Sequence, residues 1–172
     1  MSQRSLQLLA PFHDAAIRTA RRLCRSNADG DDLFQEAVLR ANDRLSELRD
    51  PSSFRSWFFA ILLTMHRRRH RRDFWRRMLP IESAPDRSAP PEADALDGAQ
   101  RMARALAVLS PEEREAIVLF ELEGFTLDEI AALQRSSLPA VKSRLSRARA
   151  RLRHHYEKDA ADLGRLAMEK NP

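Results

Sequence analysis

One stretch of the chain, residues 124–152, limits the possible folds more than any other; its sequence is GFTLDEIAALQRSSLPAVKSRLSRARARL. Thr126 and Glu129 have the spacing of a capping box, which predicts a short helix over residues 127–133. Either serine of the following QRSSLP can cap a second helix, and Pro139 is tolerated in the first turn of a helix. Two helices separated by so short a connection predict a helix-turn-helix.

The second helix of this motif has one apolar face and a cationic remainder. Its apolar residues recur at steps of four, three and four, which places them on one face: Val141, Leu145, Ala148 and Leu152. From Lys142 to Arg153 the sequence has six cations and no carboxylate, whereas a merely solvated helix usually alternates acids and bases. A helix that lies in a DNA major groove has this layout, so the segment predicts contact with nucleic acid.

The composition predicts an all-α protein in a reducing compartment. The 172 residues include four glycines and only 6% aromatic residues, so a β-rich fold is not expected. Cys24 is the single cysteine, and no disulfide can form within one chain. The N-terminus lacks the apolar core of a signal peptide, and no segment is long and uncharged enough to span a membrane. We therefore expect a cytoplasmic protein without membrane insertion, and the net charge of +5 suits a polyanionic partner.

The first half of the chain has the pattern of a small helical bundle. Apolar residues recur at helical spacing over a first predicted helix, residues 5–25, and residues 27–30 are expected to break it. A second helix is predicted to follow at Asp31. Asp50 caps a third helix with Pro51 at its first position, and this helix contains WFFAILL, which is apolar almost all round. Such a helix is expected in the middle of the bundle, and its extension, HRRRHRRDFWRR, is strongly cationic.

The second half is predicted to be a separate helical domain. Residues 79–97 contain four prolines and five carboxylates against one arginine, which is typical of an extended, mobile linker. Beyond the linker a helix is predicted over residues 99–109, and Ser110 with Glu113 caps another that ends at Gly124. We therefore expect two small helical domains, residues 1–77 and 98–157, joined by a flexible linker, residues 78–97. The C-terminal tail, residues 158–172, resembles a frayed helical end.

Motifs in both halves resemble one known family. DGDDLFQEAVLRAN followed by DPSSFRSWFFAIL resembles region 2 of the bacterial RNA polymerase sigma-70 family. LAVLSPEEREAIVLFELEGFTLDEIAAL with VKSRLSRARARLR resembles region 4 of that family. Together they make the chain similar to a group 4, extracytoplasmic-function (ECF) sigma factor. The resemblance implies a region 2 bundle of three or four helices, a region 4 helix-turn-helix, and a dissociable, non-enzymatic specificity subunit of RNA polymerase that needs no cofactor.

The acidic motif near the start of the second predicted helix is expected to bind core RNA polymerase. The helix macrodipole stabilises acids at a helix N-terminus, but it accounts less well for Gln35 and Glu36 than for the preceding aspartates. A basic or polar protein partner accounts for all of them. The resemblance implies docking on the clamp helices of the polymerase β′ subunit, together with contact to the β flap and an anti-sigma factor as a further partner. The predicted core-binding residues are Asp31, Asp32, Leu33, Gln35 and Glu36.

The resemblance assigns promoter DNA contacts to both halves. Opening the −10 element requires a pocket for an unstacked base and cations along the displaced strand. The predicted −10 residues are Arg49, Asp50, Ser52, Ser53, Arg55, Arg67, Arg68 and Arg71. The recognition helix is assigned to the −35 element, with base-edge contacts from its outward face and phosphate contacts from its flanks. The predicted residues are Lys142, Ser143, Ser146 and Arg147 for the groove, and Arg144, Arg149 and Arg151 for the backbone.

The sequence also departs from the family pattern. Arg135 replaces the usual glycine of the turn, so a non-glycine residue is expected at positive φ, at a cost of about 1 kcal/mol. Pro139-Ala140 stands where Gly-Thr is common, and Thr64 where asparagine is common.

Two other classes of protein remain open: a helix-turn-helix regulator that acts without polymerase, and a sigma-like decoy that binds an anti-sigma factor. His66 and His70 are one turn apart but lack a third ligand, so no metal site is expected. No catalytic group of residues is recognisable either.

Overall fold

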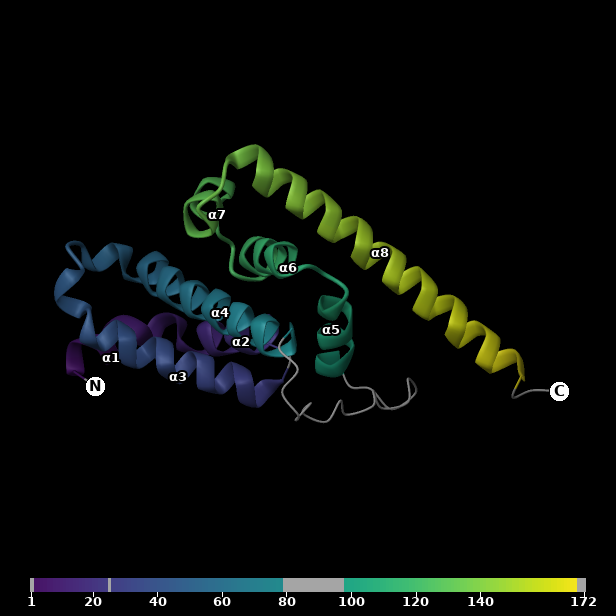
Figure 1. Ribbon diagram of the computed structural model, residues 1–172, viewed down its shortest axis with the longest axis horizontal. Helices are drawn as coiled ribbons and strands as arrows, with labels where there is room; N and C mark the ends of the chain where they lie inside the picture. Colours follow the sequence, from purple (N-terminus) through teal and green to yellow (C-terminus); the bar gives the residue numbers. More distant parts are fainter. Residues whose placement is uncertain (1, 25, 79–97, 170–172) are drawn as a thin grey trace. The chain divides into compact units, whose positions relative to one another are not determined.

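The computed structural model describes three stretches of the chain, residues 2–24, 26–78 and 98–169. Every regular element in these stretches is a helix, so the prediction of an all-α protein is confirmed. The chain separates into two compact units, Met1–Ala95 and Leu96–Pro172 (Figure 1). Each unit has its own buried core and is described by itself. The predicted linker lies outside the described residues, except for Met78 at the end of the preceding helix.

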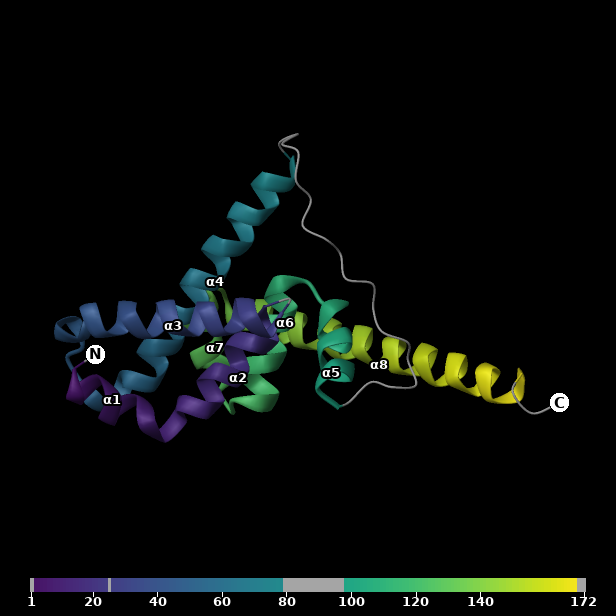
Figure 2. The ribbon, with the colours of Figure 1, turned by 90° about the horizontal axis from the view of Figure 1, so that it is seen from below.

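The N-terminal unit is a bundle whose core is filled by phenylalanine. Its helix α3 (Asn27–Asp43) packs against both α2 (His13–Leu23) and α4 (Phe54–Met78). Helix α4 also contacts α1 (Gln3–Leu9) and α2 (Figures 1 and 2). Five rings form a cluster in which neighbouring centroids are between 5.8 and 6.2 Å apart: Phe12, Phe34, Phe54, Phe58 and Phe59. The elements are α1 (Gln3–Leu9), η1 (Ala10–Phe12), α2 (His13–Leu23), α3 (Asn27–Asp43), η2 (Leu45–Glu47), η3 (Pro51–Ser53) and α4 (Phe54–Met78).

The third predicted helix has the expected buried centre. In α4 the side chains of Phe58, Phe59, Leu62 and Leu63 are fully buried. The helix is preceded by η3, a single 3-10 turn that begins at Pro51 and is capped by Asp50. Because WFFAILL is apolar on nearly every face, α4 can contact three neighbouring helices at once. The polar remainder of α4 then extends beyond this core.

The single helix predicted over residues 5–25 is wrong. The structure divides it into α1, the 3-10 turn η1 and α2, with Pro11 in the first turn of η1. Proline has no N–H to donate to the preceding turn, and its ring collides with the carbonyl four residues earlier, so an α-helix does not continue through it. Ala10 and Phe12 therefore take up the tighter 3-10 geometry, and α2 starts afresh at His13.

The predicted break at residues 27–30 is also wrong, because α3 already begins at Asn27. The Ser26 hydroxyl caps the helix by accepting a hydrogen bond from the Asp29 N–H at 3.1 Å. Gly30 lies inside the helix at a close approach to α2, where an added Cβ would be 2.4 Å from the Arg21 Cα. This glycine therefore marks a helix crossing. At its other end α3 stops at Asp43.

The C-terminal unit contains the predicted helix-turn-helix. Its elements are α5 (Gly98–Ala107), α6 (Pro111–Ile117), the π-helical turn η5 (Val118–Leu122), α7 (Leu127–Gln134) and α8 (Leu138–Glu169). The helix predicted to end at Gly124 thus finishes in a wider π-turn, in which the Glu123 N–H donates to the Val118 carbonyl at 3.2 Å. The predicted tail continues α8 as helix as far as Glu169.

Both predicted capping boxes are confirmed. The Ser110 hydroxyl accepts from the Glu113 N–H at 3.2 Å, and the Glu113 carboxylate accepts from the Ser110 N–H at 3.1 Å. Thr126 and Glu129 make the same reciprocal pair at the start of α7. The buried core of the unit lies between α6, α7 and α8, and its large members are Ile117, Val118, Leu119, Phe125, Ile130, Val141 and Leu145. No helix in the described part of the chain is long and apolar enough to cross a membrane.

Candidate nucleic-acid interface

The turn between α7 and α8 is fixed by hydrogen bonds on both sides. Arg135 has a φ of 50°, as its place in the turn predicts, and its N–H donates to the Ala132 carbonyl at 3.1 Å. Arg144 of α8 reaches back to the turn, where Nη1 donates to the Gln134 Oε1 at 2.7 Å and to the Ser136 hydroxyl at 2.9 Å. The Gln134 amide in turn donates to the Glu112 carbonyl at 2.9 Å. These bonds set the angle at which α8 leaves the turn and tie that angle to α6.

The helix α8 presents the two faces that its sequence predicts. Val141 and Ala148 are fully buried and Leu145 is 3% exposed, so the apolar face packs on the core. On the outward side the predicted groove residues are exposed: Lys142, Ser143, Ser146 and Arg147. The outward face therefore has the small polar and cationic surface that groove entry requires.

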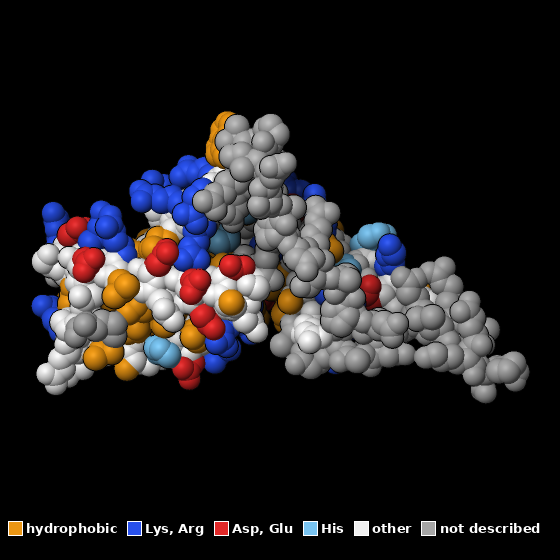
Figure 3. Space-filling view, turned by 60° about the horizontal axis from the view of Figure 1, so that its bottom comes forward, with side chains coloured by type: hydrophobic (Ala, Val, Ile, Leu, Met, Phe, Trp, Pro, Cys, Tyr) orange, Lys and Arg blue, Asp and Glu red, His pale blue; other side chains and the backbone are white. Residues whose placement is uncertain are grey.

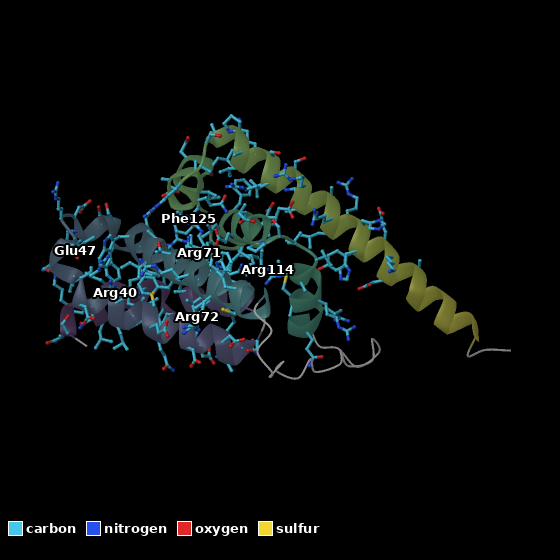
Figure 4. All side chains as sticks on the ribbon, in the orientation of Figure 1. Arg40, Glu47, Arg71, Arg72, Arg114 and Phe125 are labelled. Carbon is cyan, nitrogen blue, oxygen red and sulfur yellow. The ribbon has the colours of Figure 1, made fainter. Side chains whose placement is uncertain are left out.

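Acids of the same unit hold the flanking arginines. On one edge of α8, Arg147 and Arg151 approach the buried carboxylate of Glu113. On the other edge Arg149 donates to Glu121 at 2.6 Å, with its guanidinium over the Phe120 ring. Side chains of α6 and α8 fill the space between the two helices (Figure 4). Arg114 of α6 instead contacts α5, where its Nε donates a hydrogen bond to the Leu106 carbonyl. Arg147, Arg149 and Arg151 are thus each paired with an acid of α6 or η5.

The acidic motif on α3 divides into an exposed face and a buried anchor. Asp32, Gln35 and Glu36 are exposed, with Asp32 about one helical turn before the other two, and acidic side chains are visible over this unit in Figure 3. Leu33 is fully buried and holds the helix to the core. Asp31 accepts from Arg21 Nε at 2.6 Å, and these hydrogen bonds keep the pKa of Asp31 below its usual value.

Glu36 is the point where the acidic motif meets the cationic extension of α4. Arg69 Nη2 lies 2.8 Å from a Glu36 carboxylate oxygen, and its Nη1 donates to the Asp29 carbonyl at 3.2 Å. Only 22% of the Arg69 side chain is exposed. Arg69 therefore holds α4 to α3, unlike its exposed neighbours Arg68 and Arg71.

The predicted −10 residues lie at the start of α4 and along its extension. Asp50 accepts from the Ser52 hydroxyl, from the Ser52 N–H at 2.9 Å and from the Ser53 hydroxyl at 3.1 Å. The Ser52 hydroxyl is the main cause of the lowered pKa of Asp50, followed by the Ser52 N–H. Arg55 is half-buried, with its guanidinium 5.4 Å from the centre of the Phe59 ring. Among the described atoms, then, these short polar side chains of the turn make bonds to one another, and Arg49 beside them is exposed.

Comparison with known proteins supplies the family. Residues 8–77 match the family model described as Sigma-70 region 2, and residues 99–152 match Sigma-70, region 4. An RNA polymerase sigma-E factor of Streptomyces avermitilis is 31% identical over 91% of this chain and 86% of its own length. The ECF RNA polymerase sigma factor SigM of Mycobacterium tuberculosis is 32% identical over 85% of this chain and 74% of its own length. The chain belongs to the ECF family of RNA polymerase sigma factors.

A solved sigma-factor structure has the same fold. The sigma factor RpoE from Bartonella quintana, crystallised in complex with the anti-sigma factor NepR, aligns with a TM-score of 0.68 and 30% identity. The alignment covers 88% of this sigma factor and 95% of that chain. The two helical units described above are therefore regions 2 and 4 of a sigma factor.

Three exposed residues extend the surfaces of this sigma factor beyond the sequence prediction. Arg153 lies eleven residues after Lys142, close to three helical turns, so the two cations share one side of α8. Arg135 places a third exposed cation at the turn. On α3, Leu39 is 60% exposed and follows Glu36 by three residues, on the face of the acidic motif. Helical periodicity alone could have identified Arg153 and Leu39.

His66 has a structural position in this sigma factor. It is buried in α4, and its Nε2 lies 3.1 Å from the Leu23 carbonyl at the end of α2. The ring therefore joins two helices of region 2.

Proposed function

We propose that this sigma factor binds core RNA polymerase and directs promoter-specific initiation by contacting the −10 element through region 2 and the −35 element through region 4. The observation that carries the proposal is the joint presence of two surfaces in one chain. One is the exposed acidic face of α3, and the other is the outward face of α8, with cations and small polar residues. The chain itself acts as a specificity subunit without chemistry of its own.

Core binding is assigned to the exposed members of the acidic motif. Asp32, Gln35 and Glu36 form one continuous face of α3, and Leu39 adds an apolar side chain to it. A mixed acidic and apolar face fits a helical partner with basic and apolar side chains, such as the clamp helices of the β′ subunit. Leu33 supports this surface from beneath.

The −10 element is assigned to the start and the extension of α4. Arg68 and Arg71 are exposed cations suited to the phosphates of a displaced strand. Asp50, Ser52 and Ser53 supply short polar groups at the start of the helix, where an unstacked base can be held. Arg49 and Arg55 lie beside this turn, and Arg67 begins the cationic extension.

The −35 element is assigned to the outward face of α8. Lys142, Ser143 and Ser146 can contact base edges, with Arg147 beside them. Flanking phosphates are assigned to Arg149, Arg151 and Arg153. Arg144 instead stabilises the turn through its hydrogen bond to Gln134. We also propose an anti-sigma partner, because the similar RpoE structure is a complex with NepR.

Run-off transcription with purified core polymerase tests the proposal. Core polymerase alone and core polymerase with this chain are compared on a fragmented bacterial genome as template, and the products are sequenced. Discrete start sites that depend on the chain support the proposal. Binding of the chain to duplex DNA without core polymerase, and no effect on initiation, would instead identify a polymerase-independent helix-turn-helix regulator. A chain that binds neither core polymerase nor DNA would identify a decoy.

A further inference from the structure

Glu113 is a buried acid that lies behind the DNA-facing helix of region 4. Only 3% of the residue is exposed, and one carboxylate oxygen accepts from the Ser110 N–H at 3.1 Å. That single capping bond leaves most of the hydrogen-bonding capacity of a charged carboxylate unused. A carboxylate held away from water needs further partners to remain charged, so the other contacts of Glu113 matter for the whole unit.

The further partners come from α8, more than thirty residues later in the chain. Arg147 Nε lies 3.3 Å from Oε1 of Glu113, and Arg151 Nε lies 3.6 Å from Oε2. Both arginine side chains are more than half exposed, at 58% and 54%. They follow each other by one turn of α8, so the buried acid fixes one edge of the helix from within.

Arg147 is held at a second point as well. Its Nη1 donates to the Ser143 hydroxyl at 2.8 Å, while Nε faces Glu113. Two atoms of one planar guanidinium are thus fixed by two different helices. The group therefore keeps a single orientation, and its remaining N–H groups are available to an external acceptor.

Arg149, on the opposite edge of α8, is held by an exposed acid and by the Phe120 ring, not by a buried acid. It pairs with Glu121 at 2.6 Å, but both side chains are about half exposed. An exposed pair of this kind exchanges readily with water and with other ions. The two edges of α8 therefore differ: Arg147 is paired with a buried acid, and Arg149 is paired with an exposed acid.

We propose that Glu113 is a positioning residue for promoter specificity, holding Arg147 in the orientation in which its guanidinium contacts a base edge of the −35 element. The inference rests on the proposed function of region 4. Orientation before binding removes the rotamer entropy that a free arginine would lose on contact. The adjacent negative charge also lowers the attraction of Arg147 for phosphates in general, which widens the gap between specific and non-specific binding.

A selection experiment with holoenzyme tests this step. Core polymerase with wild-type sigma factor or a variant is used to select promoter DNA from a pool with a randomised −35 region, and base preferences are tabulated at each position. The variants are Glu113→Gln, Arg147→Ala and the double variant. Glu121→Gln is the matched control, because it releases Arg149, which is assigned to phosphate. Glutamine at 113 keeps an oxygen for the Ser110 N–H, so the cap of α6 is retained.

The expected result is local. Glu113→Gln should reduce base preference about 3- to 10-fold at the position or positions that Arg147→Ala also affects. It should have no further effect in the Arg147→Ala background, and Glu121→Gln should leave the preferences unchanged. Wild-type preference in Glu113→Gln, or an equal loss at all positions, would overturn the inference. If wild-type holoenzyme selects no −35 sequence, the proposed function itself fails instead.

A second variant keeps the inference testable if Glu113→Gln unfolds region 4. Arg147→Lys retains the positive charge, but one ammonium nitrogen lacks the planar fork that faces Glu113 and Ser143 together. This variant should bind promoter DNA with the salt dependence of the wild type and with reduced preference at the same position. Retained preference in Arg147→Lys would show that charge alone suffices and would contradict the role of Glu113.

Discussion

At the scale of single residues, two positions of the described chain have a left-handed backbone, and only one of them is glycine. Gly124 has a φ of 68° and ends the π-turn η5, while Arg135 has a φ of 50° and ends α7. The Cβ of an L-residue is crowded in this conformation, whereas glycine adopts it freely. The turn of the helix-turn-helix therefore carries strain at Arg135, which its bonds to neighbouring helices compensate.

Arg135→Gly should stabilise region 4 by about 0.5–1 kcal/mol. Glycine removes the strain of the left-handed backbone, and this gain exceeds the loss caused by the greater conformational entropy of glycine in the unfolded chain. Urea unfolding followed by circular dichroism measures the change. Both tryptophans, Trp57 and Trp75, lie in region 2, so their fluorescence should not shift. Arg135→Ala is the control for the lost charge and should give no such gain. Gly124→Ala should lower the stability of region 4, because alanine would introduce the same backbone strain at residue 124.

The Asp31–Arg21 pair makes the stability of region 2 depend on pH. Hydrogen bonds from Arg21 lower the pKa of Asp31 in the folded state, whereas the unfolded value is about 4. The pair therefore stabilises the fold above that unfolded value, and the contribution is lost as the pH falls through the folded pKa. Asp31→Asn should lower the urea midpoint of tryptophan fluorescence at neutral pH, and the difference from wild type should disappear in acid. Arg21→Gln should give the same profile; a difference that persists in acid would contradict the assignment.

At the scale of elements, the sequence predicted helices well where apolar periodicity and caps agreed. The two capping boxes and the buried face of α8 are where the sequence placed them. The errors lie where a single residue has two meanings. The helix predicted over residues 5–25 includes Pro11, which lies within a 3-10 turn, and the predicted break includes Gly30, which lies at a close helix crossing. Local propensity cannot distinguish these uses, because the decisive contact is with a different helix.

Gly30→Ala should destabilise region 2 by roughly 1–3 kcal/mol, because a Cβ would be 2.4 Å from the Arg21 Cα and 2.7 Å from its N, and backbone atoms cannot move aside as side chains do. The tryptophan fluorescence transition in urea measures this loss. Gly98→Ala in α5 is the matched control: a Cβ there meets nothing within 4 Å, so the higher helix propensity of alanine should leave region 4 unchanged or more stable. Equal stability of Gly30→Ala and wild type would show that α2 and α3 can move apart without lowering the free energy of unfolding, contrary to this prediction.

At the scale of the whole molecule, the division into two helical units was predictable, but the orientation of the charged side chains was not. Composition separated the two helical units, and periodicity separated the inner and outer faces of α8. The sequence could not show that Glu113 lies behind Arg147 or that Arg69 binds Glu36, because each pair joins residues more than thirty positions apart. Such pairs depend on how helices cross, which the core decides. The sequence therefore assigns each candidate site residue to a helix or turn, whereas the pairing of charged side chains with one another required the structure.

Because regions 2 and 4 have separate cores, defects in their two surfaces should add as free energies. Gln35→Ala in α3 should lower holoenzyme formation equally for every promoter, whereas Lys142→Ala in α8 should weaken initiation only where the −35 element is intact. The double variant, measured by run-off transcription at limiting sigma factor, should lose activity by the product of the single losses, within about 0.5 kcal/mol. A template with a scrambled −35 element is the control, on which Lys142→Ala should have little further effect. A loss in the double variant that departs from the product by more than about 1 kcal/mol would mean that core binding and −35 contact are energetically coupled, contrary to two independent surfaces.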